Sequence, residues 1–125
     1  MTMDRWLFAA GAIFALLSVA AGAFGAHGLK TRVTADMLAI FELAARYQMY
    51  HAIAIALCAF AWTRWPGPPV VVAAALFTIG ILLFSGSLYL LSLGGPRWVG
   101  AITPLGGTAW IVGWAALAWA ALRHG

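Results

Sequence analysis

The stretch "ARYQMYHAIAIALCAFAW" (residues 45–62) places an arginine, a glutamine and a histidine at the start of a long apolar run. A membrane-spanning helix needs about 20 mostly apolar residues to cross roughly 30 Å of hydrocarbon. Ionisable side chains inside such a helix are costly, so we expect Arg46, Gln48 and His51 to face the interior of a helical bundle or to reach the membrane surface.

The rest of the chain is equally apolar. Hydrophobic residues make up 65% of the 125 residues and charged residues only 8%, whereas soluble domains contain about 25% charged residues. A soluble fold of this size does not bury so much apolar surface, so the lipid bilayer is the expected solvent. The basic residues are scattered singly, which argues against nucleic acid as a partner. The lone Cys58 excludes an internal disulfide.

Four segments have the length and composition of membrane-spanning helices, at about residues 6–26, 44–64, 70–93 and 99–122. The connections "TRWPGPP" (63–69) and "GGPRW" (94–98) are short and contain proline and glycine, which interrupt helices. Helices joined by short links pack as antiparallel neighbours. We therefore predict an all-α membrane protein with one domain over residues 1–125, an antiparallel up-down-up-down four-helix transmembrane bundle.

Several residues indicate where the helices begin and end. Thr34 is a candidate N-cap for the second helix, with Asp36 in the first turn, so this helix is expected to begin well before residue 44. Gly28 is expected to end the first helix in a left-handed conformation. Pro104 is expected to begin the fourth helix or to kink it.

The polar residues around the opening stretch form a candidate cluster. On a helix, Glu42 and Arg46 are neighbours one turn apart, as are Tyr47 and His51. His27, at the end of the first helix, is expected at a similar depth. The candidate cluster, or ligand pocket, consists of His27, Glu42, Arg46, Tyr47, Gln48 and His51.

Three hypotheses compete for this cluster. The first is an interhelical lock in which these side chains bond one another and nearby carbonyls. The second is a polar pocket for a ligand, an ion or a proton path. The third is metal or haem binding by His27 and His51, although further ligands are lacking, so we predict neither a metal nor a cofactor.

Small and hydroxyl-bearing residues in the third and fourth segments form a second set. Such residues let membrane helices approach closely and hydrogen bond across helices. We predict helix packing, or lining of a cavity, for Ser85, Gly86, Ser87, Tyr89, Thr103, Pro104, Gly106, Gly107 and Thr108. The chain has no GxSxG, HExxH or phosphate-cradling motif, and no catalytic residue is predicted.

Four motifs carry a resemblance to a known family: "GAFGAHGLK" (22–30), "RYQMYHAIAI" (46–55), "FSGSLYLLSL" (84–93) and "TPLGGTAWIVGW" (103–114). Together they resemble domain-of-unknown-function family 423, small four-span proteins of the bacterial inner membrane. The resemblance implies a multi-pass protein of the bacterial plasma membrane. It implies no activity and no cofactor.

The sequence therefore leads us to expect a non-enzymatic membrane protein that acts through helix packing. Its expected partners are the lipid bilayer and either copies of itself or a larger membrane complex. The alternative is a transporter or ligand-binding protein with a polar pocket between the first and second helices.

Overall fold

The structure is a computed structural model that describes residues 1–124, so Gly125 of the predicted domain lies outside the described residues. Residues 1–124 form helices and no strand. The elements are α1 (Met3–Phe24), η1 (Gly25–Leu29), α2 (Ala35–Arg64), α3 (Pro68–Gly80), η2 (Ile81–Ser85), α4 (Gly86–Ser92), η3 (Arg97–Ala101) and α5 (Thr103–Leu122).

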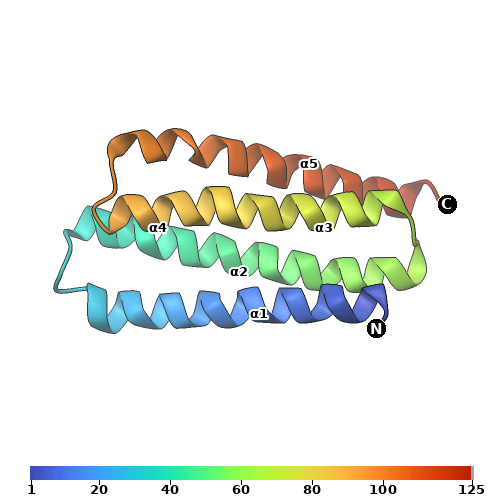
Figure 1. The fold of residues 1–125 in the computed structure, drawn as a ribbon, viewed down its shortest axis with the longest axis horizontal. Helices are drawn as coiled ribbons and strands as arrows, with labels where there is room; N and C mark the ends of the chain where they lie inside the picture. Colours follow the sequence, from blue (N-terminus) through green and yellow to red (C-terminus); the bar gives the residue numbers. More distant parts are fainter. Residues whose placement is uncertain (125) are drawn as a thin grey trace.

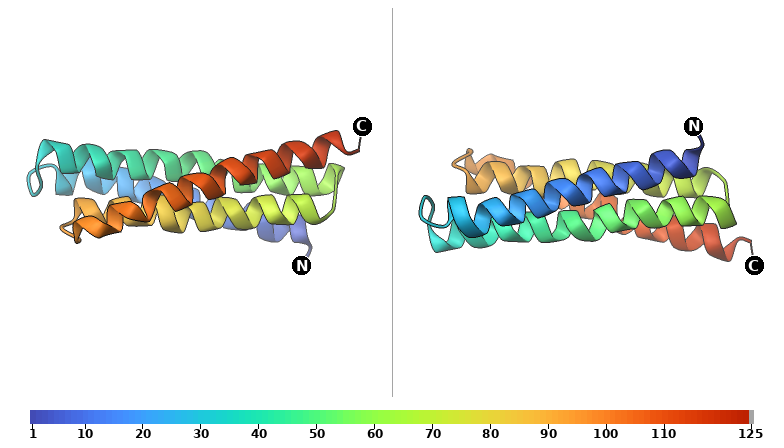
Figure 2. Two further views of the ribbon diagram at one scale, coloured as in Figure 1. Left: turned by 90° about the horizontal axis from the view of Figure 1, so that it is seen from above. Right: turned by 90° about the horizontal axis from the view of Figure 1, so that it is seen from below.

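These elements combine into four rods. The wide π-helical turns η1 and η2 continue α1 and join α3 to α4, and the 3-10 turn η3 leads into α5. Figure 1 shows the rods side by side, with the chain reversing at each connection and both termini at the same end. In Figure 2, α1 lies along α2, and α5 crosses the rod of α3 and α4 obliquely. In Figure 1, α2 lies between α1 and the rod of α3 and α4.

The helix boundaries follow from local chemistry. The prediction that Thr34 caps α2 is confirmed, since its hydroxyl accepts a hydrogen bond from the Met37 amide at 3.2 Å. Pro104 stands in the first turn of α5, where its missing amide hydrogen costs nothing, so it begins the helix. The turns before α3 and η3 use Gly67 (φ 150°) and Gly94 (φ 101°), a backbone region that side chains disfavour.

The prediction that Gly28 ends the first helix in a left-handed conformation is wrong. Gly28 lies inside the π-helical turn η1, and the helical conformation continues to Lys30 (φ −50°, ψ −36°). The extra turn buries Leu29, which is 3% exposed. Burial of this leucine favours continuing the helix past the glycine.

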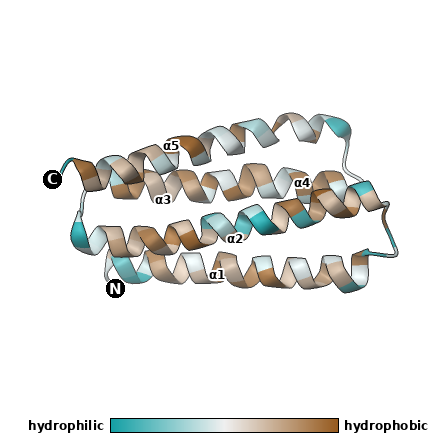
Figure 3. Ribbon diagram, turned by 180° about the vertical axis from the view of Figure 1, so that it is seen from behind, coloured by the Kyte–Doolittle hydropathy of each residue, from teal (hydrophilic) through white to brown (hydrophobic). Residues whose placement is uncertain are grey.

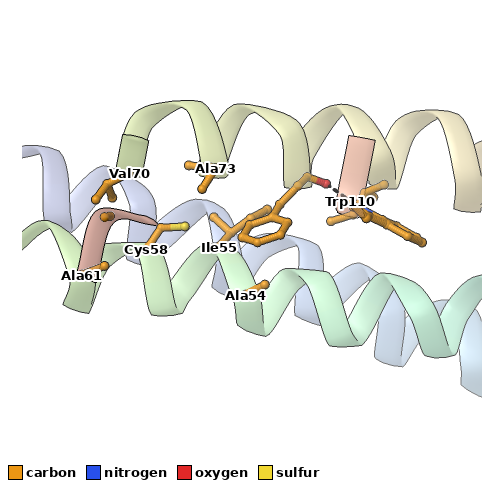
Figure 4. Close-up of a cluster of buried hydrophobic side chains, with 11 residues drawn as sticks. Ala54, Ile55, Cys58, Ala61, Val70, Ala73 and Trp110 are labelled. Atoms are coloured by element: carbon orange, nitrogen blue, oxygen red, sulfur yellow. Dashed lines mark hydrogen bonds between the residues drawn. The ribbon is translucent and has the colours of Figure 1, made fainter. Parts of the chain in front are cut away.

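The apolar core lies where α2, α3 and α5 meet (Figure 4). Small side chains such as Ala54 and Ala73 let the backbones approach, and Phe77, Ile55 and Val70 fill the space between them. Close approach is also required at Gly80, because an added Cβ would overlap the indole ring of Trp110. The core therefore combines few large side chains with many small ones.

A second close approach joins α1 to α2. A Cβ added at Gly11 would lie 2.7 Å from the carbonyl oxygen of Ala52 and 2.8 Å from the amide nitrogen of Ala56. Gly11 and Ser18 are the two buried residues of α1, seven positions apart, which is the spacing of a packed helical seam. Most of the remaining α1 surface is exposed or half-buried.

Three of the four rods are long and apolar enough to cross a membrane: Met3–Leu29, Pro68–Ser92 and Arg97–Leu122. Four were expected from the sequence. The rod formed by α2 is less apolar than the others because charged and polar residues lie along it: Asp36, Glu42, Arg46, Gln48, His51 and Arg64. Figure 3 shows hydrophilic residues at the ends of the rods and also along part of α2.

We predict that Gly11→Ala lowers the thermal unfolding midpoint of the detergent-solubilised protein. Overpacking at this crossing costs about 1–3 kcal/mol, more than the roughly 1 kcal/mol that alanine adds over glycine in a helix. Gly86→Ala is the matched control, because its added methyl group meets no atom within 4 Å. Equal midpoints for the two variants would contradict the close crossing.

Candidate functional site

Gln48, in the middle of α2, joins three helices. Its side-chain Nε2 donates a hydrogen bond to the Phe14 carbonyl of α1 at 2.9 Å. Its Oε1 accepts one from the Tyr89 hydroxyl of α4 at 2.7 Å. Gln48 is only 5% exposed, and both bonds are partly buried. A buried amide needs such partners, because an unpaired polar group in an apolar setting is costly.

Two serines bind carbonyl groups of α2 beside Gln48. Ser18 of α1 donates to the Ala45 carbonyl at 2.5 Å, and Ser85 of η2 donates to the Ala44 carbonyl at 2.8 Å. Both serines are buried. Successive residues of α2 are thus bonded to two different rods, which sets the register of α1 and of the α3–α4 rod against α2.

His51 lies one turn beyond Gln48 and is 6% exposed. Its ring stacks on the Trp110 indole of α5, with centroids 3.7 Å apart and planes 2° from parallel. The Trp114 Nε1–H donates to Nε2 of His51 at 3.1 Å, and Nδ1 lies 2.9 Å from the Tyr47 carbonyl oxygen. A carbonyl only accepts and an indole N–H only donates, so His51 is neutral with its proton on Nδ1. Both ring nitrogens of His51 are thus engaged within the protein.

Aromatic rings surround His51 and complete this part of the site. Phe77 packs against His51 with centroids 5.8 Å apart, and Phe84 packs against Trp110 at 4.5 Å. Tyr47 stacks on Phe84 at 5.4 Å. The Trp110 Nε1–H donates to the Phe77 carbonyl at 3.1 Å, the bond drawn in Figure 4. The cluster therefore ties α2, the α3–α4 rod and α5 together.

The structure separates the other members of the predicted cluster from this network. His27, Glu42 and Arg46 are exposed, whereas Gln48 and His51 are buried. The reason is the helical wheel of α2: its buried seam follows positions such as Ala45, Gln48 and Ala52, and the Glu42–Arg46 stripe falls on the opposite, outward side. An interhelical lock is thus built around Gln48 and His51, and it does not include the charged residues.

The second predicted set also divides. Ser87 and Thr103 hydrogen bond across α4 and α5 at 2.6 Å, and Ser85 and Tyr89 bond to α2 as described. Gly106 is buried against the Phe84 backbone, which leaves no room for a Cβ. The remaining four residues make no such close crossing: Pro104 and Thr108 are exposed, an added Cβ at Gly86 meets open space, and one at Gly107 meets only the Phe84 ring at 3.9 Å.

The buried polar atoms of this site are all paired within the protein. Among the described residues, every buried side-chain nitrogen and oxygen atom has a hydrogen-bond partner within the protein. Most of the grooves lie between α1 and its neighbours. One of them, with a volume of about 270 Å³, is lined mainly by apolar residues such as Phe14 and Leu82, and Gln48 and Tyr89 of the network also border it. Another lies between residues 31–37 and residues 91–94. An interior whose polar atoms are paired can hold helices in register.

Sequence reasoning missed three participants of the network: Ser18, Trp110 and Trp114. The i, i+4 spacing of Trp110 and Trp114 was the available signal, since it puts two indoles on one face of α5. Their partner His51 lies 63 positions from Trp114, and no local pattern links residues so far apart.

Comparison with known proteins gives consistent matches. The family described as "Protein of unknown function (DUF423)" matches residues 21–107. The chain is similar to the UPF0382 membrane protein YwdK of Bacillus subtilis, at 44% identity over 91% of this chain and 94% of the relative. The UPF0382 membrane protein SSP2132 of Staphylococcus saprophyticus is 41% identical over 83% of this chain and 86% of its own length. A UPF0382 membrane protein of Haemophilus influenzae is 38% identical over 90% of each chain. No solved structure matches the chain.

We predict that Gln48 and Tyr89 are energetically coupled. Gln48→Leu should lower the free energy of unfolding by about 1–3 kcal/mol, because it removes the bond to the Phe14 carbonyl and leaves the Tyr89 hydroxyl without its partner. Tyr89→Phe should cost less, and the double variant should be more stable than the sum of the single effects implies. Unfolding by denaturing detergent measures all three variants. Strict additivity would argue against the bond between the two side chains.

Proposed function

The chain belongs to the DUF423 family, whose relatives are named as membrane proteins, and on that premise we propose a role that depends on helix packing. In this proposal, the chain crosses the bacterial plasma (inner) membrane four times as an antiparallel up-down-up-down bundle. It carries out no catalysis. It acts as an oligomer or as an accessory subunit of a membrane complex.

The contact of α2 with α1 supports a fourth crossing. α1 is itself a candidate span, and α2 lies against it from the Ser18–Ala45 bond to the Gly11–Ala52 crossing. A helix of 30 residues is about 45 Å long, enough to cross with its neighbour. The polar groups that make α2 less apolar than the other rods include Gln48 and His51, and both are hidden from lipid by α1, α4 and α5.

The complete pairing of the buried polar atoms is the observation that carries the packing role. A transporter or ligand-binding protein, the alternative, needs polar atoms that are free to meet a substrate. The buried polar side-chain atoms of the described residues are all engaged with one another or with the backbone. Meanwhile α1 exposes large apolar side chains such as Trp6, Phe8 and Leu16, which a bilayer or a partner helix would cover.

We expect α2 to connect opposite sides of the membrane. In a Cys58→Ala background, Thr31→Cys before α2 and Thr63→Cys at its end are both exposed positions. An impermeant maleimide added to right-side-out vesicles should label one of these cysteines, and in inverted vesicles it should label the other. Labelling of both from the same side would mean that α2 lies on the surface and that the four-span proposal is wrong.

We also expect the polar interior to exclude water. Ser85→Cys keeps the size of a fully buried side chain that bonds to α2. A small water-soluble thiol reagent should leave this cysteine unmodified in native membranes and modify it after denaturation. Thr31→Cys is the control that should react in both conditions. Rapid reaction of Ser85→Cys in native membranes would support the transport alternative.

A further inference from the structure

The outward face of α2 carries two charges that the fold leaves uncovered. Glu42 and Arg46 are exposed and lie one turn apart on the same stripe of the helix. α1 covers the side of α2 near Ala45, the α3–α4 rod covers Ala44, and α5 covers His51. None of these contacts covers the Glu42–Arg46 stripe, which lies on the remaining side of α2.

The depth of this stripe makes the exposure unusual. Ser18 stands at the middle of the run from Trp6 to Leu29, which contains no Asp, Glu, Lys or Arg. The Ser18 hydroxyl bonds to the Ala45 carbonyl, so Arg46 is level with the middle of the α1 span. Charged side chains at this depth almost always face a bundle interior or pair with one another. Exposure of this face to lipid is therefore energetically unfavourable.

The surface around the stripe has room for a helix. A groove with a volume of about 230 Å³ runs between α1 and α2 and is lined by Ser18, Val19, Gly22, Glu42, Ala45, Arg46 and Met49. A Cβ added at Gly22 would meet no atom within 4 Å, so the α1 backbone is open to the outside there. Open glycine next to small side chains permits close approach of another membrane helix.

We propose that a second copy of this chain covers this face, so that Arg46 of each copy pairs with Glu42 of the other. The proposal rests on the four-span membrane function above. A twofold axis brings the same patch of both copies together, and it needs a patch that is complementary to itself. One acid and one base a turn apart satisfy that requirement. In a parallel twofold pair, Glu42 of one copy lies diagonally opposite Arg46 of the other, one helical turn away along the axis. A partner of unrelated sequence would have to supply both charges itself.

Cysteine cross-linking in native membranes tests the contact. In the Cys58→Ala background, Met49→Cys lies on the proposed interface. Ile111→Cys is the control, since Ile111 is 72% exposed and lies on α5, outside the proposed interface. Oxidation should give a disulfide dimer of twice the chain mass for Met49→Cys and little for Ile111→Cys. Equal yields, or an adduct of any other mass at Met49→Cys, would overturn the second copy as the occupant.

Charge exchange then tests the pairing. Glu42→Arg or Arg46→Glu alone should reduce the Met49→Cys dimer yield by more than about tenfold, because all four charges at the interface then have the same sign. The exchange of both, E42R with R46E, should restore the yield, because both copies change together. An unchanged yield in the single variants, or no recovery in the exchange variant, would overturn the proposal. An unchanged thermal unfolding midpoint of each single variant in detergent shows that the lost dimer is not a lost fold, and a lowered midpoint would assign the effect to the pair within one helix and overturn the proposal.

These outcomes are separate from those that test the four-span membrane role. If Thr31→Cys and Thr63→Cys label from the same side, the proposed function fails whatever the cross-linking yields. If they label from opposite sides while Met49→Cys does not dimerise, the four-span role stands and the second copy is excluded.

Discussion

Satisfaction of polar groups on α2 is the constraint on which the rest of the structure depends. An apolar bundle surrounded by lipid offers polar side chains no water, so each must find a partner inside the protein. Gln48 bonds to α1 and α4, and His51 bonds to α5. Each neighbouring rod therefore has one height along α2 at which these bonds form. The hydrogen bonds act mainly as position markers, since each contributes only about 0.6–2 kcal/mol between membrane helices.

Tight packing makes those bonds geometrically feasible. Bonds between a side chain and the backbone of another helix require the two backbones to lie close, and small residues at Gly11, Gly80 and Gly106 allow this. Trp110 illustrates the link: its indole occupies the space that a side chain at Gly80 would take, which brings Nε1 to the Phe77 carbonyl and leaves the ring face to His51. The same placement of Trp110 thus fills the space beside Gly80 and forms the hydrogen bond to Phe77.

The distribution of polar chemistry bears on function. The interior polar groups are all paired, which suits a scaffold better than a passage for solutes. Glu42 and Arg46, the charges far from the rod ends, lie on the outer surface of the α1–α2 pair. The proposed packing role and the proposed self-association both rest on this arrangement, in which the buried polar groups are paired and two charges lie on the outer surface.

Some features of the molecule followed from local sequence, and others did not. Apolar composition and proline-glycine connections indicated a helical membrane protein, and Thr34 marked the start of α2, because solvent preference and capping depend on nearby residues. The polar stretch from Arg46 to His51 was recognised as special, but its residues were assigned to one cluster. Only the tertiary structure decided that Gln48 and His51 are buried and that Glu42, Arg46 and His27 are exposed, since that depends on which side of α2 each neighbouring rod occupies. The partners Ser18 and Trp114 lie 27 and 63 positions from the groups they bind, and contacts so distant along the chain are set by helix packing, which no local pattern encodes.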